Sequence, residues 1–163
     1  MKILITGGTG FLGKAVVREL ISKDSILNPS EIRIYDLSDN AGIKDEKIMM
    51  ITGDIRDYEK LAASCKDIDL VIHTAAIVDW GTKSDEEVFS VNTSGTENLI
   101  RACLENNIKY LVHTSTLDVV FTGKPQVDID ESKSYPEKFV TSYCESKTLA
   151  EKAVLTANNE QLK

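Results

Sequence analysis

The chain has 163 residues, which is enough for one domain with its own hydrophobic core. Its composition is that of an ordinary globular protein, because 42% of the residues are hydrophobic and 28% are charged. The formal net charge of −7 argues against binding to nucleic acids or to anionic membrane surfaces.

The first predicted element is a buried strand over residues 3–5, which leads into a glycine-rich turn. Gly7, Gly10 and Gly13 follow at intervals of three, and apolar residues at helical spacing begin at Leu12. Glycine permits positive φ and close approach of a ligand, and a helix N-terminus offers N–H groups to a pyrophosphate. The stretch is a candidate dinucleotide loop, although many strand-to-helix turns are glycine-rich for structural reasons alone.

A second strand is predicted for residues 32–37, with Asp36 near its carboxyl end. An acidic residue about 20 positions after the glycines is where a dinucleotide fold binds the adenosine ribose. A turn-forming aspartate is the alternative. Residues 37–40 contain no Arg or Lys, so a 2′-phosphate would meet carboxylates, which favours NAD over NADP.

A polar loop leads to a third strand, residues 48–51, which is followed by a second acidic position. Asp54 could accept a hydrogen bond from the adenine amino group, with Ile55 packed on the ring. The alternative is an N-cap for the helix that begins near Tyr58. Asp57 suits that capping role better than Asp54 does.

The fourth and fifth strands are predicted for residues 70–76 and 110–116. The fourth is apolar enough to be buried on both faces, and its two terminal alanines leave room for a ligand. The fifth ends in three consecutive hydroxyl side chains. His73 and His113 occupy equivalent places in these strands, and we interpret both as core histidines.

Two more helices are predicted, over residues 85–106 and 139–159. The apolar pattern of the first is interrupted at Asn92. The second carries Tyr143 and Lys147 four positions apart, and therefore on one face.

These two side chains suggest a base. A tyrosine has a pKa of about 10, and a nearby ammonium would lower it. A hydroxyl from Thr116 or Ser115 could hold a substrate oxygen beside Tyr143, which would make an alcohol dehydrogenase site. An ordinary surface pair is the alternative for Tyr143 and Lys147.

Strands and helices alternate along the whole chain, which predicts an α/β fold: a doubly wound parallel sheet with helices on both faces. In such sheets ligands bind at the carboxyl ends of the strands, where the glycine loop, the two acidic positions, the alanines and the hydroxyls all fall. The three cysteines, Cys65, Cys103 and Cys144, lack metal-ligand spacing. We therefore expect reduced thiols and no metal site. Residues 1–12 are too short and too glycine-rich for a signal peptide, and no apolar run is long enough to span a membrane, so we expect a cytoplasmic protein.

Six motifs, taken together, resemble the extended short-chain dehydrogenase/reductase family. They are TGGTGFLG at residues 6–13, Asp36, GDIRD at 53–57, HTAA at 73–76, NTSGT at 92–96 and YCESK at 143–147. Their order and spacing are similar to those of the family over essentially the whole chain. The tracts HTAAIVDWG, HTSTLDVV and YCESKTLAEKAVL are most similar to the 3β-hydroxysteroid dehydrogenase/isomerase branch. The resemblance implies a Rossmann-type fold and an NAD cofactor.

The resemblance also implies residue roles. The implied cofactor-binding residues are Gly7, Thr9, Gly10, Phe11, Leu12, Gly13, Asp36, Asp54, Ile55, Thr74, Ala75, Ala76, Asn92, Tyr143 and Lys147. Tyr143 would be the base, and Lys147 would bind the nicotinamide ribose and tune the tyrosine. Thr116 would be the hydroxyl partner, with Ser115 as its competitor.

Extended members of that family continue far beyond the tyrosine helix. We therefore expect residues 1–163 to be the NAD(P)-binding domain of a longer protein, truncated before the last strands and the substrate domain. Such a chain should be inactive alone, and its free apolar sheet edge would favour self-association, for instance as a homodimer.

For the whole protein, the first hypothesis is NAD-dependent oxidation of a secondary alcohol, a 3β-hydroxysteroid or a similar small molecule, to the ketone. The second is a nucleotide-sugar epimerase or dehydratase that recycles a bound NAD. The third is a dinucleotide sensor without catalysis, which the intact Tyr–Lys pair disfavours.

Overall fold

The computed structural model describes residues 1–159 and 161–163, and its centre is a sheet of five parallel strands. The spatial order is β3-β2-β1-β4-β5. The strands are β1 (Lys2–Thr6), β2 (Glu31–Asp36), β3 (Ile48–Thr52), β4 (Leu70–His73) and β5 (Tyr110–His113). The chain builds outward from β1 to β3 and then returns to place β4 on the other side of β1. This reversal makes a crevice at the carboxyl ends of β1 and β4, and it confirms the predicted doubly wound fold.

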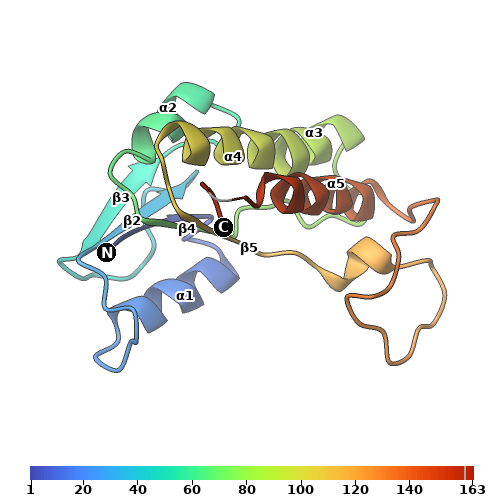
Figure 1. The fold of residues 1–163 in the computed structure, drawn as a ribbon, viewed down its shortest axis with the longest axis horizontal. Helices are drawn as coiled ribbons and strands as arrows, with labels where there is room; N and C mark the ends of the chain where they lie inside the picture. Colours follow the sequence, from blue (N-terminus) through green and yellow to red (C-terminus); the bar gives the residue numbers. More distant parts are fainter. Residues whose placement is uncertain (160) are drawn as a thin grey trace.

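Helices cover both faces of the sheet, but unequally (Figure 1). One face carries α1 (Phe11–Ile21), and the opposite face carries α2 (Tyr58–Ser64), α4 (Gly95–Glu105) and α5 (Ser142–Ala157). Short helices complete the chain: α3 (Asp85–Phe89), a π-helical turn η1 (Ser90–Ser94) and a 3₁₀ turn η2 (Leu117–Val120).

Two apolar layers hold the sheet between these helices, and the alternation of side chains along β1 explains both. Ile3 and Ile5 point toward α1, where they are buried with Val17. Leu4 points the other way and is buried with Leu99 of α4. Because both faces are covered, β1 is a continuous apolar run instead of an alternating one.

Three details of the predicted elements were wrong. Strands β4 and β5 each end three residues earlier than expected, at His73 and His113, so the alanines and the hydroxyls lie on turns beyond the sheet. The connection from β2 to β3 contains no helix, so the alternation of strands and helices is not complete. The helix expected over residues 85–106 is divided by the π turn at Ser90–Ser94.

The outer edge of β5 is unevenly covered. Leu111 is buried beneath the larger helical layer, whereas Tyr110 and Val112 face the α1 side and are about half exposed. Backbone bonds join Lys163 to Lys109 and Leu111 along this edge. Within the described residues, no helix combines the length and apolar character that crossing a bilayer requires.

Candidate active site

The glycine loop packs the start of α1 directly against the end of β1. Gly7 adopts a φ of +73°, and its N–H donates to the Tyr35 carbonyl at 3.0 Å. A Cβ on Gly7 would lie 2.6 Å from the backbone N of Ala75, and a Cβ on Gly13 would lie 2.2 Å from the Gly7 oxygen. Gly10 caps α1 without a side-chain hydrogen bond, which leaves the first N–H groups of the helix available to an anion.

A cleft of about 380 Å³ opens beside this loop, at the crevice that the sheet topology creates. Nine of the predicted cofactor-binding residues line it: Gly7, Thr9, Gly10, Asp36, Asp54, Ile55, Thr74, Ala75 and Ala76. Sequence reasoning missed eight others: Tyr35, Leu37, Gly53, Arg56, Ile77, Lys83, Glu87 and Val91. The glycine-lined wall fits part of a dinucleotide. The other six expected cofactor-binding residues lie outside this lining: Phe11, Leu12, Gly13, Asn92, Tyr143 and Lys147.

Asp36 lies where the ribose-binding acid was expected, at the carboxyl end of β2 and in the wall of the cleft. Its Oδ2 atom accepts the Thr9 N–H at 2.9 Å, and its Oδ1 atom accepts the Ser38 N–H at 3.3 Å. These bonds fix the carboxylate between the glycine loop and the turn after β2.

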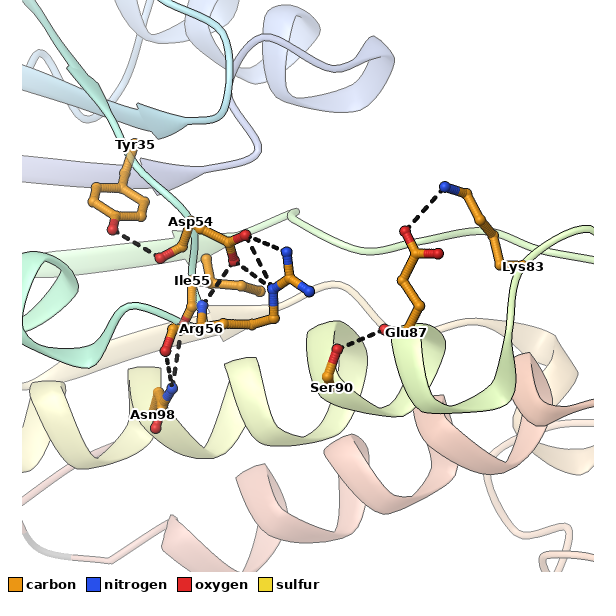
Figure 2. Close-up of polar contacts among 8 residues, drawn as sticks. All are labelled: Tyr35, Asp54, Ile55, Arg56, Lys83, Glu87, Ser90 and Asn98. Carbon is orange, nitrogen blue, oxygen red and sulfur yellow. Dashed lines mark hydrogen bonds and ion pairs between the residues drawn. The ribbon is translucent and has the colours of Figure 1, made fainter.

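The lining of the cleft also contains two cations, each paired with a carboxylate (Figure 2). The Arg56 guanidinium holds Asp54, with Nη2 2.5 Å from Oδ2, and this hydrogen bond lowers the pKa of Asp54. Lys83 Nζ lies 2.9 Å from Glu87 Oε1. No Arg or Lys follows Asp36 in residues 37–40, but these two cations reach the cleft from segments farther along the chain.

The Asp54 segment is also fixed through its backbone. The Tyr35 hydroxyl donates to the Asp54 carbonyl at 2.9 Å, and Asn98 donates to the Ile55 carbonyl at 3.2 Å (Figure 2). Asp54 does not cap α2, which was the alternative role for it. The N-cap is Asp57, whose side chain accepts the Lys60 N–H at the start of α2.

Asn92 joins the cleft to the helix that carries the candidate base. It is buried in the π turn, where its amide accepts the Ile77 N–H at 2.8 Å and donates to the Ile77 carbonyl at 2.9 Å. Its Nδ2 also donates to Ser146 Oγ at 3.1 Å, and Thr93 donates to the Ser146 carbonyl. Single π turns are frequent at functional sites, and this one contains Asn92, which the sequence predicts to be a cofactor-binding residue.

Tyr143 and Lys147 are both buried, at 5% and 4% exposure, so they are not an ordinary surface pair. Burial raises the pKa of Tyr143, and the nearby Asp118 carboxylate adds to the rise. Lys147 Nζ points to the turn directly after β5, where it donates to the Thr114 carbonyl at 2.8 Å. The expected lowering of the Tyr143 pKa by Lys147 is therefore not what the structure shows. Burial lowers the pKa of Lys147 itself to about 8.

The two candidate hydroxyls have different partners. Ser115 donates to the Glu151 carboxylate, which also accepts the Tyr135 hydroxyl at 2.7 Å. Thr116 lies toward Tyr143 and donates to Asp118 Oδ2 at 3.0 Å. The geometry therefore favours Thr116 over Ser115 as the partner of the tyrosine.

The two histidines lie side by side, with ring centroids 5.2 Å apart, but only His73 is fully buried and His113 is partly buried. His73 is buried and bonded on both ring nitrogens, to Thr6 Oγ1 at 2.6 Å and to Thr96 Oγ1 at 3.0 Å. His113 Nε2 lies 3.4 Å from Lys147 Nζ, and burial lowers the pKa of His113 to about 4. Burial lowers the pKa of His73 as well, so both rings are neutral near pH 7. The interpretation as a core histidine is confirmed for His73, whereas His113 lies at the margin of the core. Cys65, Cys103 and Cys144 are free and buried.

Comparison with known proteins identifies the family. The family described as 3-beta hydroxysteroid dehydrogenase/isomerase matches residues 4–163. The chain belongs to this family. The match spans the glycine loop, the cleft and the Tyr143 helix together.

Named relatives in this family are between 35% and 36% identical to the chain. A monkeypox virus 3β-hydroxysteroid dehydrogenase/Δ5→4-isomerase is 35% identical over 95% of the chain and 46% of its own length. Mouse 3β-hydroxysteroid dehydrogenase type 7 is 36% identical over 98% of the chain and 45% of its own length. A decarboxylating sterol-4-α-carboxylate 3-dehydrogenase from Schizosaccharomyces pombe is 36% identical over 100% of the chain and 48% of its own length. The chain thus spans about half the length of the curated relatives it matches.

Solved structures share the fold. A dTDP-glucose 4,6-dehydratase from Streptomyces venezuelae, solved with NAD, has a TM-score of 0.86 and 25% identity over 96% of the chain and 51% of its own. A short-chain dehydrogenase/reductase superfamily protein from Agrobacterium tumefaciens, solved with NAD, has a TM-score of 0.79 and 25% identity over 94% and 44%. Extended short-chain dehydrogenases are therefore the structural relatives of this member of the family.

Proposed function

We propose that residues 1–163 are the cofactor-binding domain of an NAD-dependent oxidoreductase that oxidises a secondary alcohol, a 3β-hydroxysteroid or a similar apolar alcohol. The observation that carries this proposal is the link through Asn92. It joins the cleft wall at Ile77 to Ser146, which lies between the candidate base Tyr143 and Lys147 on α5. A dinucleotide in the cleft and an alcohol at Tyr143 would thus share one rigid frame.

The side chains of this chain would have the following roles in the oxidation of the alcohol. Thr116 and Tyr143 hold the substrate oxygen, and Tyr143 accepts the hydroxyl proton as a phenolate. Lys147, with a pKa of about 8, is mostly an ammonium at neutral pH and would bind a ribose hydroxyl of the cofactor. When bound, NAD⁺ supplies the hydride acceptor and a positive charge that favours the phenolate. The glycine loop and the start of α1 would hold the pyrophosphate.

The substrate class is tested on the full-length protein with NAD⁺ and a panel of a 3β-hydroxysteroid, UDP-glucose and dTDP-glucose. We expect NADH absorbance to rise with the steroid and to stay at background with both sugar nucleotides. Turnover of a sugar nucleotide without net NADH would replace the dehydrogenase by an epimerase or dehydratase, the chemistry named for the Streptomyces relative. NAD binding without turnover of any of the three would favour a sensor.

The cofactor preference is tested on the chain itself by thermal shift with NAD⁺ and NADP⁺. A ligand that binds the folded state raises the melting midpoint in proportion to the logarithm of its concentration over Kd. We expect a larger shift with NAD⁺, because a 2′-phosphate would meet the Asp36 carboxylate. The cations of the cleft, Arg56 and Lys83, are already paired with carboxylates.

The variant Asp36→Ala should weaken NAD⁺ binding about tenfold or more, since hydrogen bonds to a charged group contribute about 1.5–3 kcal/mol. The variant should also reduce the difference between the melting-midpoint shifts that NAD⁺ and NADP⁺ produce. Asp39→Asn is the matched control, because Asp39 is exposed in the same turn and outside the cleft. Equal shifts with NAD⁺ and NADP⁺ in the unaltered chain would contradict the preference.

A further inference from the structure

Trp80, the single tryptophan of the chain, stands exposed beside the candidate base. Its side chain is 60% exposed, whereas Tyr143 is 5% exposed. The two ring centroids are 6.4 Å apart, with the planes tilted by 47°. A large aromatic ring that is exposed next to the candidate base is in a position to pack against an apolar ligand at that base.

The loop that carries Trp80, between β4 and α3, is anchored on both sides of the indole. Before it, Ile77 is held by the two hydrogen bonds of the buried Asn92 amide. After it, the buried Asp79 carboxylate accepts the N–H groups of Gly81 at 2.7 Å and Thr82 at 3.0 Å. An aromatic side chain on a loop bonded in this way loses little further freedom when a ligand covers it.

Exposed apolar side chains on the loops that carry Trp80 and Thr116 favour an apolar ligand over a charged one. Val78 is 67% exposed in the same loop, and Leu117, directly after Thr116, is 71% exposed. The charge beside the candidate base is negative, because Asp118 accepts the Thr116 hydroxyl and raises the pKa of Tyr143. A diphosphate would be repelled there, whereas a hydrocarbon ring system would bury exposed apolar surface.

We propose that Trp80 is a substrate-specificity residue whose indole packs against the fused apolar rings of the alcohol that Tyr143 deprotonates. The inference rests on the proposed function and names the side chain that recognises the hydrocarbon part of the substrate. In this proposal Thr116 and Tyr143 bind the hydroxyl of the substrate, and Trp80 contacts its rings.

The test uses the full-length protein and three variants: Trp80→Ala, Trp80→Phe and Ile26→Ala. Ile26 is a fully exposed apolar residue after α1 and serves as the matched control. We measure KM and kcat for a 3β-hydroxysteroid, KM for NAD⁺, and the Kd of the 3-ketosteroid product by equilibrium dialysis. Melting midpoints establish that each variant is folded.

Trp80→Ala should raise the steroid KM and the ketosteroid Kd about tenfold, the effect of losing one well-packed aromatic contact. Trp80→Phe should recover most of this loss, and KM for NAD⁺ should stay within about twofold throughout. A ketosteroid Kd that is unchanged in Trp80→Ala would overturn the proposal, as would a parallel rise in KM for NAD⁺. A parent protein that oxidises no steroid would instead refute the proposed function itself.

Discussion

Tyr143→Phe should lower kcat of the full-length protein for its alcohol by about 10²- to 10⁴-fold, the range that a positioned general base contributes. The change removes one oxygen atom from a buried ring and leaves the ring itself in place. The steroid assay with saturating NAD⁺ measures the loss. Because Tyr143 lies outside the lining of the dinucleotide cleft, the Kd for NAD⁺ should change by less than about threefold.

Tyr110→Phe is the matched control for this result. Tyr110 lies on β5 and is about half exposed on the α1 side of the sheet, so the same loss of a hydroxyl there should leave kcat unchanged. If the Tyr143→Phe variant retains most of the turnover of the parent protein, Tyr143 is not the base. A fall in kcat accompanied by an equal loss of NAD⁺ affinity would indicate a positioning effect instead of proton transfer.

Much of this fold could be predicted because local chemistry and global topology agree. The apolar run of β1 and the glycines that follow it indicate a strand, a tight turn and a helix without any tertiary information. Asp36 and the alanines could then be assigned to one end of the sheet, since parallel strands place their carboxyl ends together. Their assembly around one cleft confirms that reasoning.

Arg56 and Lys83 show where such reasoning stops. Each lines the cleft, yet neither lies near the glycine loop or Asp36 in sequence. Arg56 pairs with Asp54, and Lys83 pairs with Glu87. These pairs depend on the direction of each side chain, and the spacing of apolar residues in the sequence does not predict that direction. The GDIRD motif contained the signal for Arg56, because a cation two residues after an acid can fold back onto it.

The choice between Ser115 and Thr116 was open for a similar reason. Adjacent residues leaving a strand point to opposite sides, and the point where the strand ends decides which side faces the site. Because β5 ends at His113, Ser115 meets Glu151 while Thr116 meets Tyr143. The spacing of Tyr143 and Lys147 correctly indicated one helix face. It did not indicate that the lysine would extend past the tyrosine to the Thr114 carbonyl.

Gly13→Ala should destabilise the chain severely, by about 3 kcal/mol or more, although alanine is the better helix former by about 1 kcal/mol. The added Cβ would lie 2.2 Å from the Gly7 oxygen and 2.6 Å from the Gly8 Cα. Both atoms belong to the backbone, so no side chain can rotate away. Relief would require α1 to move off β1, which would open the apolar layer that contains Val17.

Urea unfolding of the chain, followed by circular dichroism, measures this effect as a lower midpoint at an unchanged slope. Gly10→Ala is the control within the same loop. Its φ of −73° suits alanine, and the new Cβ would lie 3.2 Å from the Gly7 oxygen, so a loss of about 1 kcal/mol or less is expected. Equal midpoints for the two variants would mean that α1 can shift without cost. The close packing of helix on strand, on which the cofactor cleft depends, would then be wrong.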